Sequence, residues 1–182
     1  MKRVCVFCGS RSGTSPAYAE AARSLGRLLV ARGLGLVFGG GHVGLMGAIA
    51  DAVLAAGGKA IGVIPQGLVN RELAHAGCTT LHVTQSMHDR KALMADLSDA
   101  FIALPGGCGT LDETFEILTW AQLGLHSKPI GLLNVEGFYD GLLAYLEHTA
   151  RQGFIKPADR GLLLHAAQPE ELLAQLLKLA AN

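Results

Sequence analysis

The chain has 182 residues, of which 50% are hydrophobic and 16% are charged, with 15 basic and 15 acidic side chains. This length fits one domain with a sizeable core, and the composition excludes a disordered chain. The balanced charge offers neither a basic field for nucleic acid nor a polybasic strip for a membrane surface, so we expect a small-molecule ligand.

The N-terminus passes from two charged residues directly into a strand-like run, which is too short for a secretory segment. No apolar stretch approaches the ~20 residues that a membrane span requires. We therefore expect no membrane association and a cytoplasmic location.

Short apolar runs alternate with helical patterns along the chain. Buried strands are predicted at 3–8, 34–38, 59–64, 79–84, 99–104 and 129–134, with a weaker one at 161–165. Helices are predicted at 16–32, 43–56, 86–97, 110–123, 138–152 and 169–180. This alternation predicts an α/β fold, a doubly wound parallel sheet with helices on both faces. No linker or repeat marks a boundary, so 1–182 is interpreted as one domain.

Cys5 and Cys8 form a C-x-x-C pattern that resembles a redox pair or half of a zinc site. Side chains of a strand alternate between faces, so these two thiols should point in opposite directions. No second C-x-x-C or paired histidine motif completes a zinc set. We expect buried, reduced thiols.

Three predicted strands end in glycine-rich loops that lead into helices, at 9–15, 39–47 and 105–110. Such loops can direct free backbone N–H groups and a positive helix end at an anion. One loop alone indicates only a turn, but three at corresponding strand ends favour a phosphorylated ligand.

The second loop contains G-x-G-x-x-G as Gly39, Gly41 and Gly44. A dinucleotide site would also need an acidic residue at the end of the next strand, which instead ends in Pro65-Gln66. No Walker-type motif occurs either. A mononucleotide therefore fits better than NAD or ATP.

Two charged residues stand where charge is costly. Arg90 shares a predicted helix face with Met87, Met94 and Leu97, so it needs a carboxylate or phosphate partner unless it extends to water. The same helix begins with a capping-box pattern, and the neighbouring Lys91 is a secondary candidate for binding.

Glu113 lies in the first turn after the third glycine-rich loop. Thr110 and Glu113 also fit a capping box, which is the structural alternative to a catalytic role. Because Glu113 and Asp112 would repel a phosphate at this helix end, we expect Glu113 nearer the sugar. His42 could contact substrate from its loop, His88 is interpreted as a helix-start residue, and no Asp/His spacing indicates a metal.

Three motifs together resemble the LOG family of cytokinin riboside 5′-monophosphate phosphoribohydrolases, which are often mislabelled lysine decarboxylases. They are Gly-Gly-Gly-x-x-Gly-Leu-Met-Gly at 39–47, Met-His-x-Arg-Lys-x-x-Met at 87–94 and Pro-Gly-Gly-x-Gly-Thr-x-x-Glu at 105–113. The resemblance covers essentially the whole chain. It implies a Rossmann-like fold, a homodimer, and release of free base and ribose 5-phosphate.

By this resemblance the essential arginine falls on Arg90 and the essential glutamate on Glu113. The expected substrate-binding residues come from the loops and the helices after them: Gly9, Ser10, Gly40, Gly41, Met46, Lys91, Pro105, Gly106, Gly107, Gly109 and Thr110. No cofactor and no metal is expected, since no lysine stands out as a pyridoxal-phosphate site. Cys108 occupies a variable position that leaves the base preference open.

Two alternatives remain at this point. An enzyme of broader specificity would cleave plain AMP or other nucleoside 5′-monophosphates. A non-catalytic sensor or carrier would use the same glycine-rich loops without requiring Arg90 and Glu113 together.

Overall fold

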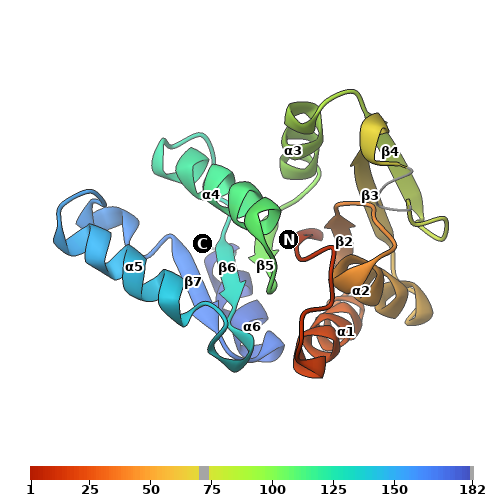
Figure 1. The fold of residues 1–182 in the computed structure, drawn as a ribbon, viewed down its shortest axis with the longest axis horizontal. Helices are drawn as coiled ribbons and strands as arrows, with labels where there is room; N and C mark the ends of the chain where they lie inside the picture. The colour runs from red at the N-terminus through yellow and green to blue at the C-terminus, as the bar shows by residue number, and fades with distance from the viewer. Residues whose placement is uncertain (70–73, 181–182) are drawn as a thin grey trace.

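A computed structural model describes residues 1–69 and 74–180 (Figure 1). Seven strands form one sheet: β1 (Arg3–Phe7), β2 (Gly35–Phe38), β3 (Ala60–Pro65), β4 (Thr80–Thr84), β5 (Ala100–Ala103), β6 (Ile130–Leu133) and β7 (Leu163–Ala166). The helices between and after them are α1 (Pro16–Ala31), α2 (Gly44–Ala55), α3 (Met87–Asp96), α4 (Cys108–Gln122), α5 (Asp140–Arg151) and α6 (Pro169–Ala180).

The strand order is β4-β3-β2-β1-β5-β6-β7, and every neighbouring pair is parallel. The predicted doubly wound α/β sheet is therefore confirmed. The chain builds outward from β1 to one edge and then resumes at β5 on the other side of β1. The switch point between β1 and β5 is where such folds bind ligands, beyond the carboxyl ends of the strands.

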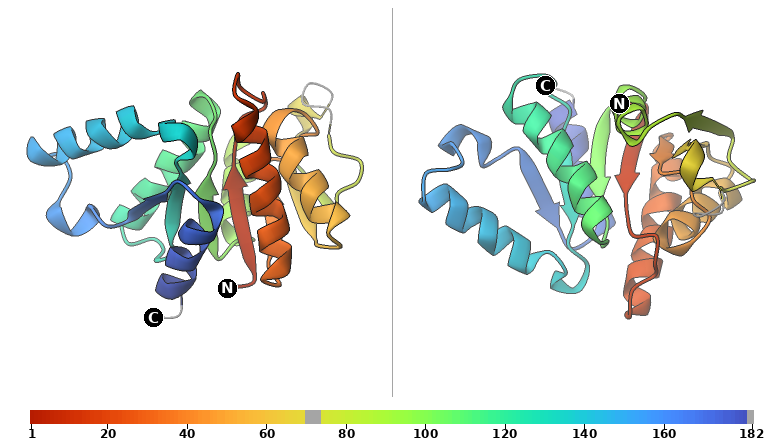
Figure 2. Two further views of the ribbon diagram at one scale, coloured as in Figure 1. Left: turned by 90° about the horizontal axis from the view of Figure 1, so that it is seen from below. Right: turned by 45° about the horizontal axis from the view of Figure 1, so that its top comes forward.

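The alternation of side chains along β1 divides the core into two layers. Val4 and Val6 pack with residues of α1, α2 and α6, whereas Cys5 and Phe7 pack with residues of α3 and α4. Figure 2 shows α1 and α2 side by side on their face of the sheet. Each fully buried side chain of this size stabilises the fold by roughly 1.5–3 kcal/mol.

The two N-terminal thiols obey the same alternation. Cys8 belongs to the layer under α1 and α2, and Cys5 belongs to the opposite layer. The prediction that they face opposite sides is confirmed, and all four cysteines are free. Leu118 of α4 is buried and belongs to the same core layer as Cys5 and Phe101.

Local signals place most helix ends within two residues of the prediction. The side chain of Ser15 accepts a hydrogen bond from Ala17 N–H, with Pro16 at the first helical position. Gly33 follows the end of α1 with a φ of 69°, a conformation that glycine adopts without strain. Ser86 and Asp89 form the predicted capping box of α3.

The predicted capping box of Thr110 and Glu113 is wrong. Helix α4 begins two residues earlier, at Cys108, and Gly107 is its N-cap. The glycine-rich loop is tight enough for the first helical turn to include Cys108 and Gly109, so Thr110 lies inside the helix. Glu113 is therefore not the partner of an N-cap side chain.

Within the described residues, none of the helices combines the length and the apolar character needed to cross a bilayer.

Candidate active site

A cavity of about 630 Å³ opens at the switch point of the sheet. Its walls come from the three glycine-rich loops after β1, β2 and β5, from the first turns of α2 and α4, and from α3. This volume lies in the range of small-molecule sites, roughly 300–1,000 Å³. A ligand-sized cavity is therefore present at the position that both the fold and the sequence motifs indicate.

Backbone hydrogen bonds join the three loops to one another. Gly9 N–H donates to the carbonyl of Pro105 at 3.0 Å, and Leu45 N–H donates to the carbonyl of Gly9 at 3.0 Å. A side chain at Gly106 would overlap the hydroxyl of Thr110 and approach Gly9 N at 2.9 Å. The loops therefore meet at distances that only glycine allows, and Gly9 connects all three.

Arg90 is held rigidly although it is charged and only 5% exposed. Its Nε donates to the carbonyl of Val63 at 3.1 Å, and its Nη2 donates to the carbonyl of Gly39 at 3.2 Å. The carbonyl of Val63 lies in the second half of β3, and that of Gly39 directly follows β2. Fixed hydrogen bonds on two sides leave the guanidinium little freedom, which suits a group that must hold substrate oxygens in place.

Glu113 lies opposite Arg90. Its Oε1 is 3.7 Å from Nη2 of Arg90, and Glu113 is 9% exposed and lines the cavity. The convergence of these two side chains, on which the sequence hypothesis depended, is present. A buried carboxylate next to a fixed guanidinium, beside loops of free amides, can stabilise positive charge that develops on a bound sugar.

Cys8 also lines this cavity but is not a nucleophile. Burial raises the pKa of the Cys8 thiol well above its ordinary value, and the negative charge of Glu113 raises it further against the opposing effect of Arg90. A thiolate is the reactive form of cysteine. Cys8 therefore stays protonated and contributes packing beneath the site.

Lys91 points from α3 to α4. Its Nζ lies 3.1 Å from a carboxylate oxygen of Asp112 and 3.1 Å from one of Glu116, and its side chain is 10% exposed. Burial lowers the pKa of the Lys91 ammonium, but the two carboxylates outweigh burial and hold the pKa above its ordinary value. The three side chains join the two helices that carry Arg90 and Glu113.

Most residues predicted for the site line the cavity together. They are Gly9, Ser10, Met46, Arg90, Pro105, Gly106, Gly107, Gly109, Thr110 and Glu113. Gly40, Gly41 and Lys91 are not part of the lining. Gly40 accepts a hydrogen bond from His75 N–H, and Gly41 forms a β-bridge with Ala74, so both contribute to the fold of the loop behind the cavity. Neither His42 nor His88 lines the cavity.

Several lining residues escaped the sequence reasoning. Tyr18 and Phe138 form an edge-to-face pair with ring centroids 5.6 Å apart, and both line the cavity together with Leu68 and Arg11. Phe138 follows the carboxyl end of β6, and Tyr18 lies in the first turn after the first glycine-rich loop. The rule that ligands bind at carboxyl strand ends could have found both residues.

Comparison with known proteins agrees with these motifs. Residues 46–176 match a protein family described as "Possible lysine decarboxylase". The cytokinin riboside 5′-monophosphate phosphoribohydrolase LOG1 of Arabidopsis thaliana is 50% identical over 96% of this chain and 82% of that protein. The chain belongs to the LOG family. The probable cytokinin riboside 5′-monophosphate phosphoribohydrolase LOGL5 of Oryza sativa subsp. japonica is 51% identical over 96% of this chain and 71% of that protein.

Solved structures confirm the fold of this LOG-family chain. The molybdenum cofactor carrier protein of Chlamydomonas reinhardtii superposes with a TM-score of 0.76 at 23% identity, covering 100% of this chain and 99% of that one. At this identity the likeness extends to the fold alone. A decarboxylase of the pyridoxal-phosphate type would need a lysine at its cofactor, and the described residues that line the cavity include none.

Proposed function

We propose that this LOG-family chain hydrolyses the N-glycosidic bond of N6-modified adenosine 5′-monophosphates and releases the free base, a cytokinin, with ribose 5-phosphate. The observation that carries the proposal is the buried pair of Arg90 and Glu113 beside three joined glycine-rich loops. Identity near 50% to phosphoribohydrolases over 96% of the chain supports the same reaction.

The phosphate of the nucleotide binds to backbone amides of the loops, with Arg11 at the rim. The ribose then lies over Arg90 and Glu113. The base extends toward the apolar part of the lining, which includes Tyr18, Leu68 and Phe138. Binding energy from the phosphate positions the reacting bond, which lies several atoms away.

In the reaction the bond between ribose C1′ and N9 of the base breaks, and the bonding electron pair leaves with the base. The sugar acquires oxocarbenium-like positive charge, which the Glu113 carboxylate stabilises. Water adds its oxygen to C1′; one of its protons stays on that oxygen as the new hydroxyl, and the other goes to the departing base. Glu113 is also placed to orient the ribose hydroxyls or the water, while Arg90 holds substrate oxygens. Water and protein groups alone complete this chemistry.

The fold by itself does not separate an enzyme from a carrier, because a molybdenum cofactor carrier protein shares it. A carrier needs the amides of the loops but no carboxylate at the sugar. The buried Arg90–Glu113 pair therefore favours hydrolysis over the sensor or carrier alternative. Cys108, at the exposed first position of α4 and in the cavity lining, is placed to affect which base is preferred.

The subunit organisation and location belong to the same proposal. We treat 1–182 as one nucleotide-binding domain of a cytoplasmic homodimer, although 70–73 and 181–182 lie outside the described residues. Leu123 and Leu125 after α4 are 68% and 69% exposed, and Phe154 after α5 is 86% exposed. Apolar side chains this exposed favour burial against a second copy, which light scattering would detect as twice the monomer mass.

The direct test is to incubate the purified protein with AMP and, separately, with N6-isopentenyl-AMP and to measure free base and ribose 5-phosphate by chromatography. We expect release from the modified nucleotide. Equal release from AMP would indicate the broader nucleosidase, and binding without release would indicate the sensor or carrier. Glu113→Gln should abolish base release yet keep nucleotide binding. Glu170→Gln makes the same substitution at an exposed glutamate of α6 and, as the control, should keep both release and binding.

A further inference from the structure

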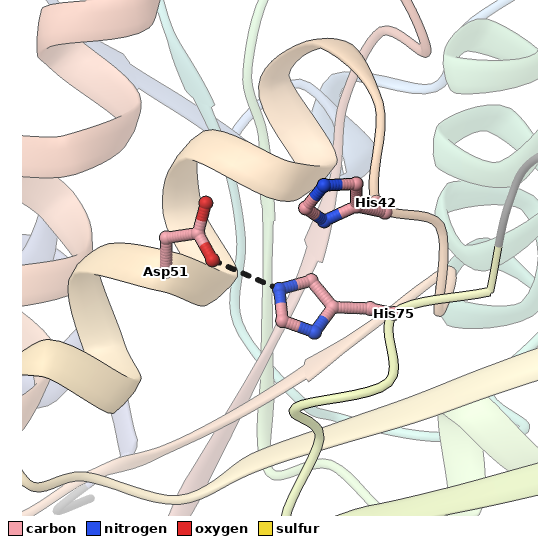
Figure 3. A group of neighbouring side chains, drawn as sticks. All are labelled: His42, Asp51 and His75. Atoms are coloured by element: carbon pink, nitrogen blue, oxygen red, sulfur yellow. Dashed lines mark hydrogen bonds and ion pairs between the residues drawn. The ribbon is translucent and has the colours of Figure 1, made fainter.

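Outside the active site, His42, Asp51 and His75 come together from three segments of the chain (Figure 3). Each offers one nitrogen or oxygen atom, and these three atoms lie within 4.8 Å of one another. His42 precedes α2, Asp51 lies in α2, and His75 belongs to the segment that leads to β4. The positions of these residues in the sequence do not form a metal-binding motif. His75 is distant from His42 and Asp51 along the chain, and only the fold places it beside them.

Two of the three positions are fixed by the surrounding structure. His75 is 5% exposed, its N–H donates to the carbonyl of Gly40 at 2.9 Å, and its Nε2 lies 3.0 Å from Oδ1 of Asp51. Asp51 is held by the helix. The His42 ring lies against the His75 ring, with centroids 5.1 Å apart, and its side chain is exposed and able to turn.

We propose that His42, Asp51 and His75 form a site for a divalent transition-metal ion such as Zn²⁺. Two imidazoles and one carboxylate, with water in the remaining position, are a common donor set for zinc. Ligand atoms of a tetrahedral zinc site lie about 3.3 Å apart when each bond is about 2.0 Å. The Asp51 and His75 atoms, 3.0 Å apart, are already close to this spacing, so the main side-chain movement that binding requires is a rotation of His42.

The donor set also decides which ions are excluded. Imidazole nitrogen favours zinc, nickel, cobalt and copper, whereas magnesium and calcium prefer oxygen ligands. Arg23 and Arg27 line the same surface hollow as His42 and Asp51, but both pair with Glu20. A single aspartate beside these arginines attracts magnesium and calcium only weakly. The selectivity for transition-metal ions therefore depends on the imidazole nitrogens of the two histidines.

His75 couples binding to a local rearrangement. Gly77 N–H donates to Nδ1 of His75 at 3.1 Å, so in the metal-free ring the hydrogen is on Nε2 and points at Asp51. An ion at Nε2 takes the place of that hydrogen, and a neutral ring then carries its hydrogen on Nδ1. Gly77 N–H loses its acceptor as a result. This cost weakens the affinity and gives binding a specific signature at the Gly77 amide.

The bound ion would brace the second glycine-rich loop. It would tie His42, at the end of that loop, to α2 and to the segment that already pairs with Gly40 and Gly41. The carbonyl of Gly39 in the same loop accepts a hydrogen bond from Arg90. The role is structural, and it does not depend on the reaction proposed for the active site.

The test uses untagged, chelator-treated full-length protein titrated with ZnCl2 by calorimetry, with MgCl2 and CaCl2 in parallel. We expect one zinc ion per chain, no heat from magnesium or calcium, a higher Tm with zinc, and a zinc-dependent shift of the Gly77 amide resonance. His42→Ala and Asp51→Asn, both at exposed side chains, should each weaken zinc binding at least tenfold. His148→Ala removes an exposed histidine of α5 and should change nothing.

Zinc binding that is equally tight in His42→Ala and in the wild-type protein would overturn the proposal, and so would the absence of binding. Zinc captured by the exposed thiol of Cys108 would persist in the histidine variant and disappear in Cys108→Ser. That pattern would also overturn it. Metal-free His42→Ala should keep the wild-type Tm, which separates loss of the site from loss of the fold.

Discussion

Arg90 and Glu113 face each other at 3.7 Å although they belong to helices that follow different strands, β4 at the edge of the sheet and β5 beside the central strand β1. Helix α3 belongs to the crossover between these strands, and its buried residues pack on the face of the sheet with residues of β3 and β2. This path allows Arg90 to donate to the carbonyls of Val63 and Gly39 on its way to Glu113. The topology of the sheet thus places Arg90 and Glu113 next to each other.

Arg90→Lys should lower kcat by roughly 100-fold, because the single nitrogen of an ammonium cannot replace both Nε, which donates to Val63, and Nη2, which donates to Gly39 and faces Glu113. The overall charge is unchanged, so nucleotide binding should weaken less than turnover. Steady-state rates of base release, with Kd measured separately for a non-hydrolysable nucleotide, check this. A lysine variant with wild-type kcat would show that the guanidinium geometry is irrelevant.

Lys91→Met distinguishes a brace between helices from a contact with substrate. If Lys91 joins α3 to α4 through Asp112 and Glu116, the variant should lose about 1 kcal/mol of stability and about 2–4 °C in Tm. Asp112→Asn and Glu116→Gln together should then reproduce its kinetics. If Lys91 binds the nucleotide as the resemblance implies, KM should rise in Lys91→Met but not in the carboxylate double variant.

Gly39→Ala should reduce turnover by roughly 100-fold while the protein stays folded. A methyl group at Gly39 would overlap Nη2 of Arg90 and contact the sulfur of Met46 at 3.0 Å, so the guanidinium must move. Gly141→Ala in α5 meets nothing within 4 Å and is the matched control. Circular dichroism and base-release assays on both variants test this. Normal turnover by Gly39→Ala would contradict the placement of Arg90.

His126 should make stability depend on pH. Its Nε2 lies 3.0 Å from the carbonyl of Ile117 and its Nδ1 accepts from Lys128 N–H, so a second proton on the ring would break the latter contact. Burial lowers the pKa of His126 below 6.5, the Lys128 ammonium lowers it further, and the Ile117 carbonyl only partly offsets both. As pH falls through 6.5 the unfolded chain binds a proton that the folded chain resists.

The free energy of unfolding should therefore decrease as the pH falls from about 7.5 to about 5.5. Urea denaturation across this range measures it. His126→Gln should show a shallower decrease than the wild-type protein, and His148→Gln, at an exposed ring, should not. An equal slope in His126→Gln would assign the pH dependence to other groups.

The strands and helices could be predicted from sequence because both of their signals are local. Buried parallel strands appear as continuous apolar runs, and residues such as Ser15, Gly33 and Ser86 mark helix ends through contacts within a few positions. The start of α4 was misplaced for the same reason. A Thr-x-x-Glu pattern looks the same whether threonine caps a helix or lies inside it, and only the close packing of Gly106 on Thr110 decides.

The site was predictable where motif and topology coincide. Arg90 stood out as a charge within an apolar stripe, and Glu113 followed a glycine-rich strand end. The hydrogen bonds of Arg90 could not be predicted from the sequence, because Val63 lies 27 positions and Gly39 lies 51 positions from Arg90. The cluster of His42, Asp51 and His75 was hidden likewise, since no regular spacing joins a loop, a helix and a distant segment.

The hydrogen bonds of Gly9 to the two other loops have a practical consequence for engineering. Because the three glycine-rich loops form a single connected unit, a substitution in any one loop should disturb all three and lower turnover. Selectivity for a different base should instead be sought at Tyr18, Leu68 and Phe138, whose side chains line the cavity outside this unit. A library confined to those positions can vary the substrate while the reaction centre remains intact.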